Sequence, residues 1–198
     1  MTDNFNIIAD YIKGKTQVGD FYFLQILKRR KDNPTLNCDM IVIDNFFIKD
    51  ETDLLKKRER IIELCEMNNA RAYFRLNKRS SKKVALQTLR LIADNIASDN
   101  YDIKNCYLSC CGQYASDENK TWIIDLDGET TPSPLMMAHI DYECEPLAKD
   151  VNDGKCVMTI PTKNGIHLIT KPFNLMKFRQ KYPNIDIHKD NPTILYCK

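Results

Sequence analysis

Two aspartates, Asp125 and Asp127, stand two residues apart at the end of the apolar segment Trp-Ile-Ile-Asp-Leu-Asp. Successive side chains of a strand point to opposite faces, so these two carboxylates project from the same face. Like charges that close repel each other unless a cation lies between them. Carboxylate oxygens are preferred ligands of Mg²⁺, and two-metal sites use them for phosphoryl chemistry. The pair, with Glu129 as the next same-face acid, predicts a site for Mg²⁺ or Mn²⁺; the alternative is a solvated strand end.

His167 lies in a second short apolar segment, Gly-Ile-His-Leu-Ile, which begins at Gly165. Glycine lets a backbone approach a ligand closely, and the N–H groups of such a turn can cradle a phosphate. Lys163 and Lys171 flank the segment and would attract a triphosphate. We therefore expect Lys163, Gly165 and His167 to contact a nucleotide. The alternative is an ordinary half-buried strand histidine.

A third acidic position comes near the end of the chain, in Ile185-Asp186-Ile187. A carboxylate between β-branched residues is unusual, and Asp186 can complete a three-acid metal site with Asp125 and Asp127. Asp190 competes for this role, although an aspartate in a turn usually serves backbone hydrogen bonds. The other interpretation of Asp186 is the solvent face of an edge strand.

Basic residues gather between residues 71 and 83, interleaved with Tyr73 and Phe74. Arginine with aromatic residues is typical of surfaces that bind phosphates or nucleic acids. The members are Arg71, Arg75, Lys78, Arg79, Lys82 and Lys83. We expect Arg75 and Arg79 in particular to contact the substrate. A solvated helix start is the alternative.

The elements that position these residues follow from periodicity and turn signals. Helices are expected over 5–13, 50–68, 80–98, 135–149 and 174–182, and strands over 21–28, 40–48, 70–76, 107–111, 122–126, 156–160 and 166–170. A final strand pair is expected over 185–187 and 193–196. The turn 161–165 holds an Asn-Gly pair, which predicts a hairpin of the strands over 156–160 and 166–170. Strands alternate with helices but hairpins also occur, which predicts an α+β fold, a mixed sheet with flanking helices. We expect one domain over 1–198, with an N-terminal αβ part to about residue 68 and a catalytic part from about 69.

Charge and cysteine content limit the class of protein. Lysine plus arginine total 29 against 27 acids, which excludes a polybasic protein and requires any nucleic-acid contact to be local. No leader-like segment or long apolar run is evident, so we expect a cytoplasmic protein without membrane association, its cysteines reduced. A zinc site would need Cys106, Cys110, Cys144 and Cys156, but only the first two have suitable spacing.

In order and spacing, these motifs resemble the archaeo-eukaryotic primase superfamily, the primase-polymerases. That family carries a hydrophobic-Asp-hydrophobic-Asp motif, then small-x-His, then hydrophobic-Asp. The corresponding residues here are Ile124–Asp127, Gly165–His167 and Ile185–Asp186. The segment 71–80 also resembles the basic, aromatic stretch that precedes the first motif. The resemblance covers about residues 70–190 and best fits a small phage- or plasmid-type member.

The resemblance implies a catalytic core built on an RNA-recognition-motif-like sheet. It implies that Asp125, Asp127 and Asp186 bind divalent metals and that His167 contacts the phosphates of an incoming nucleotide. The activity would be that of a DNA or RNA primase-polymerase, which joins nucleoside triphosphates on a template. A bare core of this length would depend on other replication proteins. The alternatives are a non-catalytic nucleic-acid-binding accessory protein and a metal-dependent nuclease.

Overall fold

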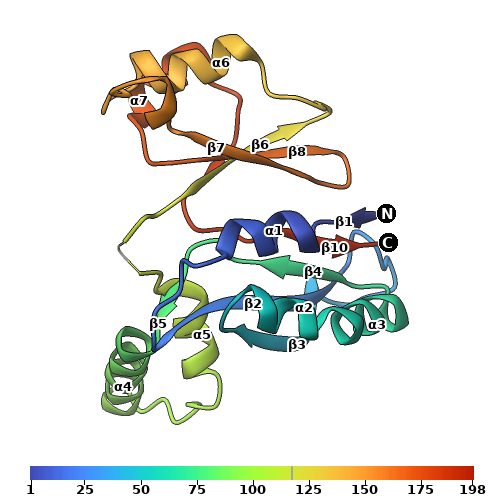
Figure 1. Ribbon diagram of the computed structural model, residues 1–198. Helices are drawn as coiled ribbons and strands as arrows, with labels where there is room; N and C mark the ends of the chain where they lie inside the picture. Colours follow the sequence, from blue (N-terminus) through green and yellow to red (C-terminus); the bar gives the residue numbers. More distant parts are fainter. Residues whose placement is uncertain (117) are drawn as a thin grey trace.

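The computed structural model describes residues 1–116 and 118–198 as an α+β fold with two antiparallel sheets and flanking helices (Figure 1). The α+β class is thus confirmed. The mixed sheet is not, because every strand pairing in the described residues is antiparallel. Hairpins supply part of the strand order, and long-range pairings supply the rest.

The first sheet has the strand order β1-β10-β4-β2-β3, and β5 pairs with β2 outside this path. The bounds are β1 (Thr2–Asp3), β2 (Asp20–Arg29), β3 (Met40–Ile48), β4 (Arg71–Phe74), β5 (Arg79–Ser80) and β10 (Thr193–Cys197). The strands expected over 21–28 and 40–48 form the β2–β3 hairpin, which pairs Tyr22 with Ile48 at one end and Arg29 with Met40 at the other. At the opposite edge of the sheet, the last strand β10 pairs with the first strand β1.

Five helices flank this sheet: α1 (Phe5–Ile12), α2 (Glu51–Lys56), α3 (Arg58–Asn68), α4 (Ser81–Ala97) and α5 (Cys106–Gln113). The single helix expected over 50–68 is two helices, interrupted at Lys57. Asp50 caps the first of them by accepting a hydrogen bond of 2.7 Å from the Asp53 N–H. The strand expected over 107–111 is wrong, because this short apolar run forms α5.

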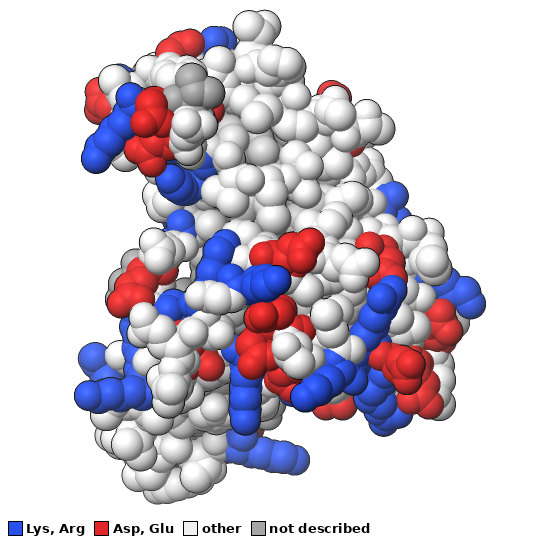
Figure 2. Space-filling view, viewed as in Figure 1, with Lys and Arg blue, Asp and Glu red and all other residues white. Residues whose placement is uncertain are grey.

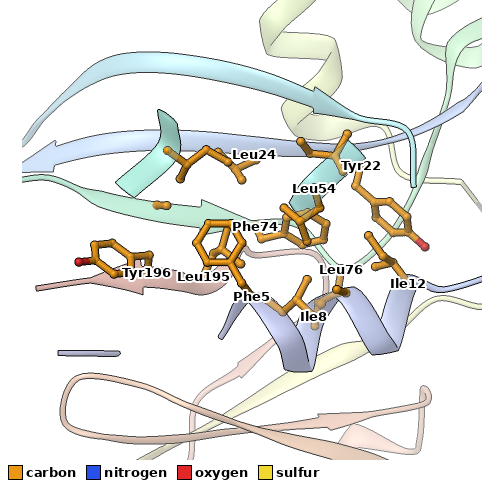
Figure 3. Close-up of a cluster of buried hydrophobic side chains, with 14 of the residues drawn as sticks. Phe5, Ile8, Ile12, Tyr22, Leu24, Leu54, Phe74, Leu76, Leu195 and Tyr196 are labelled. Carbon is orange, nitrogen blue, oxygen red and sulfur yellow. The ribbon is translucent and has the colours of Figure 1, made fainter. Parts of the chain in front are cut away.

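Side chains alternate between the two faces of β2. Tyr22, Leu24 and Ile26 belong to the main core, whereas Phe21 and Phe23 pack with α4 and α5 on the other face. Figure 3 shows Phe5, Ile8 and Ile12 of α1 meeting Tyr22, Leu24, Phe74 and Leu195 of the sheet. The same core contains Ile123, Ile160 and Ile169 of the second sheet. A shared core joins the two sheets, with α1 between them (Figure 1).

The second sheet has the order β7-β8-β6-β9. Its strands are β6 (Trp122–Asp127), β7 (Cys156–Pro161), β8 (Gly165–Thr170) and β9 (Ile187–His188). The expected β7–β8 hairpin is confirmed. Between these strands lie α6 (Pro134–Ala138), a π-helical turn η1 (His139–Glu143), a 3₁₀ turn η2 (Val151–Asp153) and α7 (Leu175–Lys181). The helices α6 and α7 cover the outer face over Ile124, Leu126 and Leu168 (Figure 1).

The prediction that the strands over 185–187 and 193–196 pair with each other is also wrong. Both strands exist, but β9 pairs with β6 and β10 pairs with β4 and β1. The intervening turn therefore carries the chain from the second sheet back to the first. Residues 114–116 and 118–121 lie on the outward connection, and Asn77 bonds both the N–H and the carbonyl of Thr121 at its end. The two sheets thus divide near residues 114–121.

Candidate functional site: a row of acids and a histidine across three strands

The carboxylates of Asp125 and Asp127 extend from the end of β6, as the alternation of its side chains predicts. Ile124 and Leu126 are buried under the helical cap, which anchors the strand. The side chain of Asp125 is 31% exposed, and Asp127 is exposed. This face of β6 is turned toward the first sheet, because Ile123 on the same face belongs to the shared core. The aspartates therefore lie where that core ends.

His167 lies directly opposite Asp125 on the neighbouring strand β8. Its Nε2 is 3.6 Å from Asp125 Oδ1, and its Nδ1 is 2.8 Å from the Thr193 hydroxyl. Burial lowers the pKa of His167, and Asp125 only partly offsets this effect. The ring is therefore neutral at pH 7, with one nitrogen held by Thr193 and the other facing the acids.

Asp186 lies on the other side of Asp125, next to β9. The β6–β9 register pairs Ile123 with His188 and Ile124 with Ile187, and the Asp125 N–H donates to the Asp186 carbonyl at 3.0 Å. Directly opposite residues of antiparallel strands have Cβ atoms about 5 Å apart and share a face. The structure thus brings His167, Asp125 and Asp186 together as one row across β8, β6 and β9.

Gly165 sets the spacing between β8 and the end of β6. A Cβ atom there would lie 2.2 Å from the Leu126 carbonyl oxygen, so no larger residue fits without a backbone shift. The Gly128 N–H donates to the Asn164 carbonyl at 2.8 Å, which closes this end of the strand pair. The close approach serves the strand pairing. The N–H of Gly165 is used within the turn, since it donates to Thr162 Oγ1.

A cavity of about 510 Å³ opens beside this row. Four acidic residues line it, Asp125, Asp127, Glu129 and Asp186, together with neutral residues of segment 131–136 and with Asn184 and Ile185. No lysine or arginine lies on its wall among the described residues. The cavity is therefore strongly electronegative and large enough for a small charged ligand.

The donor set fits Mg²⁺ or Mn²⁺, since every candidate ligand is a carboxylate oxygen. Within residues 1–116 and 118–198, neither Asp127 nor Asp186 has an ion-pair partner, and Asp125 has only His167. In the same residues, however, no three acidic, histidine or cysteine side chains already converge on one metal position. A cation would have to draw the exposed carboxylates of Asp127 and Asp186 inward.

The arginines expected to bind substrate lie elsewhere and are used internally. Arg79 is fully buried, and its five N–H donors all have acceptors. Nη1 and Nη2 bond the two Asp190 oxygens at 3.2 and 2.8 Å, and the other contacts are the carbonyls of Cys111, Asn77 and Gly112. A guanidinium has five donors, so none remains for a phosphate. The structure assigns Arg79 to an internal ion pair.

Arg75 joins the same cluster, because its Nη1 donates to the Asp190 carbonyl. Burial lowers the pKa of Arg75, and neighbouring Arg79 adds to the effect. Its Nε is buried without a hydrogen-bond partner among the described residues. Arg71 forms a further internal pair, in which Nε lies 2.7 Å from Asp32 Oδ2. Lys163 lies at the tip of the β7–β8 hairpin, where its Nζ is 3.6 Å from the same Asp32 carboxylate.

Two residues of this region gave little or no signal in the sequence. Thr193 holds His167 although 26 positions separate them, and nothing local to either residue indicates the contact. Asp190 follows the expectation for a turn aspartate only in part, because its carboxylate bonds arginines and Asn77 rather than its own turn. The four cysteines considered for zinc lie on α5 and in the second sheet region, and the described residues contain no such metal cluster.

Comparison with known proteins adds no relative: no family model, curated protein or solved structure matches this chain. None of the helices in the described part of the chain has the length and apolar character needed to cross a bilayer. The site must therefore be interpreted from its own geometry.

Proposed function

We propose that the protein is a metal-dependent primase-polymerase that adds nucleotides to a nucleic-acid strand on a template. The observation that carries the proposal is the row His167–Asp125–Asp186. Three motifs that are distant in the sequence meet on three adjacent strands, and the aspartates of two of them line one acidic cavity. Their convergence in the order β8-β6-β9 is what a shared active site requires.

The topology of the second sheet supports the same proposal. Along the chain its elements run strand, helix, two strands, helix, strand, and the spatial order is β7-β8-β6-β9. This is the arrangement of split β-α-β sheets, to which RNA-recognition-motif domains belong. The resemblance of the motifs to primase-polymerases implies such a core. Sheet and motifs therefore favour the same family, by independent features.

Asp125, Asp127 and Asp186 would hold Mg²⁺ or Mn²⁺ in this proposal. Bound divalent ions neutralise the triphosphate and stabilise the pyrophosphate as it leaves. The 3′-oxygen of the growing strand forms a bond to the α-phosphorus, the bond to pyrophosphate breaks, and the hydroxyl proton passes to solvent. The carboxylates position both reactants, which supplies most of the rate enhancement in phosphoryl transfer.

His167 would orient the triphosphate rather than exchange protons. In one tautomer Nδ1 accepts a hydrogen bond from the Thr193 hydroxyl, and the ring proton is on Nε2. The Nε2–H group is then a donor on the side of Asp125. A neutral ring can donate to a phosphate oxygen without attracting Asp125 as strongly as an imidazolium would. Thr193 is then a positioning residue, since it fixes the ring without touching substrate.

The experiment uses a labelled primer on a template strand, nucleoside triphosphates and Mg²⁺ or Mn²⁺, resolved on a sizing gel. We expect extension by the unaltered protein and loss of at least about 100-fold in the Asp125→Asn/Asp127→Asn variant. Asp10→Asn/Asp102→Asn is the matched control, since both aspartates are exposed and lie outside the cavity. Shortening of the label would indicate a nuclease, and retardation alone a non-catalytic binding protein.

A further inference from the structure

Two hollows adjoin where the chain passes between the sheets. One, of about 400 Å³, has Lys83, Lys189, Trp122 and Asp190 on its wall, and the other, of about 760 Å³, has Lys15, Lys78, Lys171 and Tyr11. Lys120 and Pro172 line both. In Figure 2 the molecular surface is hollowed on the left between its upper and lower parts, with lysine and arginine side chains around the recess. We name the two together the basic hollow.

The basic hollow has the opposite charge to the acidic cavity. Its wall contains six lysines and, among the described residues, only two acids, Asp190 and Glu118. The Asp190 carboxylate is already bonded by Arg79, with Arg75 beside it. Glu118 is largely exposed and lies 3.5 Å from Lys78. The described lining residues of the basic hollow therefore carry more positive than negative charge.

Three of these lysines lack a strong carboxylate partner in the described part of the chain. Lys15 lies over the Tyr11 ring with Nζ 3.4 Å from its centroid, and Lys189 lies 5.3 Å from the Trp122 centroid. Lys171 pairs only with Asp153, at 3.5 Å, and both side chains are about half exposed. Such a surface pair contributes little. Lys78 differs, because Asp20 holds it at 2.6 Å.

The edge strand β9 connects the basic hollow to the acidic cavity. Asp186 lines the cavity and Lys189 lines the hollow, three residues further along. At about 3.3 Å per residue, the Cα atoms of these two residues lie about 10 Å apart along this edge. No strand pairs with the outer side of β9 among the described residues. An extended chain of phosphates can therefore lie along β9 with one end at the acids.

We propose that the basic hollow binds the phosphodiester backbone of a single-stranded nucleic acid, the template or primer strand, which then follows β9 to the acidic cavity. The proposal rests on the proposed function, because a nucleotide-joining site needs such a strand beside it. Lysines interleaved with Tyr11 and Trp122 are typical of surfaces that bind single strands without sequence preference. The strand is thereby assigned to the lysines of the basic hollow rather than to Arg75 and Arg79.

The test measures binding of a fluorescein-labelled 20-nucleotide DNA single strand by anisotropy, in EDTA so that metal at the acids plays no part. We expect Lys15→Gln/Lys171→Gln/Lys189→Gln to weaken binding at least 10-fold at low salt. The slope of log Kd against log salt should fall by about 2, since each phosphate contact on a single strand contributes about 0.7. Lys56→Gln/Lys104→Gln/Lys149→Gln is the control, because these lysines are exposed and lie outside the hollow.

The charge-preserving variant Lys15→Arg/Lys171→Arg/Lys189→Arg should bind within about 2-fold of the unaltered protein, and matching thermal unfolding curves establish that each variant folds. Equal binding by the glutamine variant and its control would overturn the inference, as would tighter binding of a poly-glutamate peptide of equal charge. Loss of binding by the glutamine variant without any extension activity in the unaltered protein would contradict the proposed function alone. Extension with unchanged binding would contradict this inference alone.

Discussion

Asp186 and Asp190 are four residues apart, yet their surroundings are opposite. Asp186 is exposed, has no ion-pair partner in the described residues, and lies across from Asp125 at the wall of a cavity. Asp190 receives two bonds from a fully buried arginine and a third from Asn77. A carboxylate whose hydrogen-bond and ion-pair partners all come from the fold stabilises the structure. A carboxylate without such partners is available for a ligand. The contrast favours Asp186 over Asp190 as the third acid of the site.

The sharpest way to break this contrast is to remove the arginine of the Asp190 cluster. Arg79→Ala leaves the Asp190 carboxylate and three backbone carbonyls without their donor. Breaking a buried pair on one side costs about 3–5 kcal/mol, and since Asp190 is 28% exposed we expect the lower end. Urea unfolding followed by circular dichroism measures the loss.

Arg60→Ala is the control for that substitution, because Arg60 pairs with Glu63 on an exposed helix face. Such pairs contribute about 0.5 kcal/mol or less. If Arg79→Ala lowered the free energy of unfolding no more than Arg60→Ala does, the Asp190 cluster would not be the internal support described above.

A smaller effect is expected at the acid row, where Gly165 permits the approach of β8 to β6. Gly165→Ala would force the new Cβ against the Leu126 carbonyl oxygen, and such overpacking costs about 1–3 kcal/mol. The shift would move His167 relative to Asp125, so extension activity should fall more than stability does.

Gly112→Ala provides the matched glycine substitution. Its added Cβ would meet only Arg75 Nη2, at 3.8 Å, an ordinary contact within helix α5. Alanine is the better helix former, so stability should stay equal or rise by about 0.5–1 kcal/mol. Equal thermal midpoints for the two variants would show that the close approach at Gly165 is not required.

The smallest expected effect is the pH dependence caused by His167. Its pKa in the folded protein is lowered by burial, against an ordinary value near 6.5. The unfolded chain therefore binds more protons as the pH falls below about 6.5, and stability is lost from there down to the lowered pKa. The neighbouring charges modify this effect of burial, since Asp125 and Asp127 raise the pKa of His167 and His188 lowers it.

The His167→Gln variant should lose this pH dependence. Urea midpoints at pH 7.5, 6.5 and 5.5 measure it, with a limit of about 1.4 kcal/mol per pH unit for one proton. Asp32 and Asp53 have lowered pKa values and titrate below 3.8, outside this range. The same slope in both proteins would mean that His167 is not the group responsible.

Local patterns predicted most elements of this fold because helix periods, strand alternation and turn residues are short-range features. The strands β2 and β3, the β7–β8 hairpin and the strand carrying Asp125 were all expected. The run 107–111 is only a few apolar residues long, and such runs do not distinguish strand from helix. Its outcome as α5 depends on packing against Phe21 and Phe23.

Ion pairs and strand pairs between residues far apart in the chain could not be predicted from the sequence. The partner of Arg79 is 111 positions away and that of Arg71 is 39 positions away, so the basic segment looked like a surface. Strands β9 and β10 looked like a hairpin, because the turn between them gives no indication that they join different sheets. The common face of Asp125 and Asp127 was easier to predict, since alternation along β6 needs only local geometry.

The most direct measurement of the central claim is a Mn²⁺ titration followed by electron paramagnetic resonance. The account predicts that the unaltered protein binds Mn²⁺ and that Asp125→Asn/Asp127→Asn loses the bound ion, while Asp10→Asn/Asp102→Asn retains it. At pH 7.5 the asparagine variant at Asp125 and Asp127 should keep its thermal midpoint, because the one ion-pair contact of these carboxylates among the described residues is with the neutral ring of His167. Unchanged Mn²⁺ binding by Asp125→Asn/Asp127→Asn would contradict the assignment of this row as the metal site.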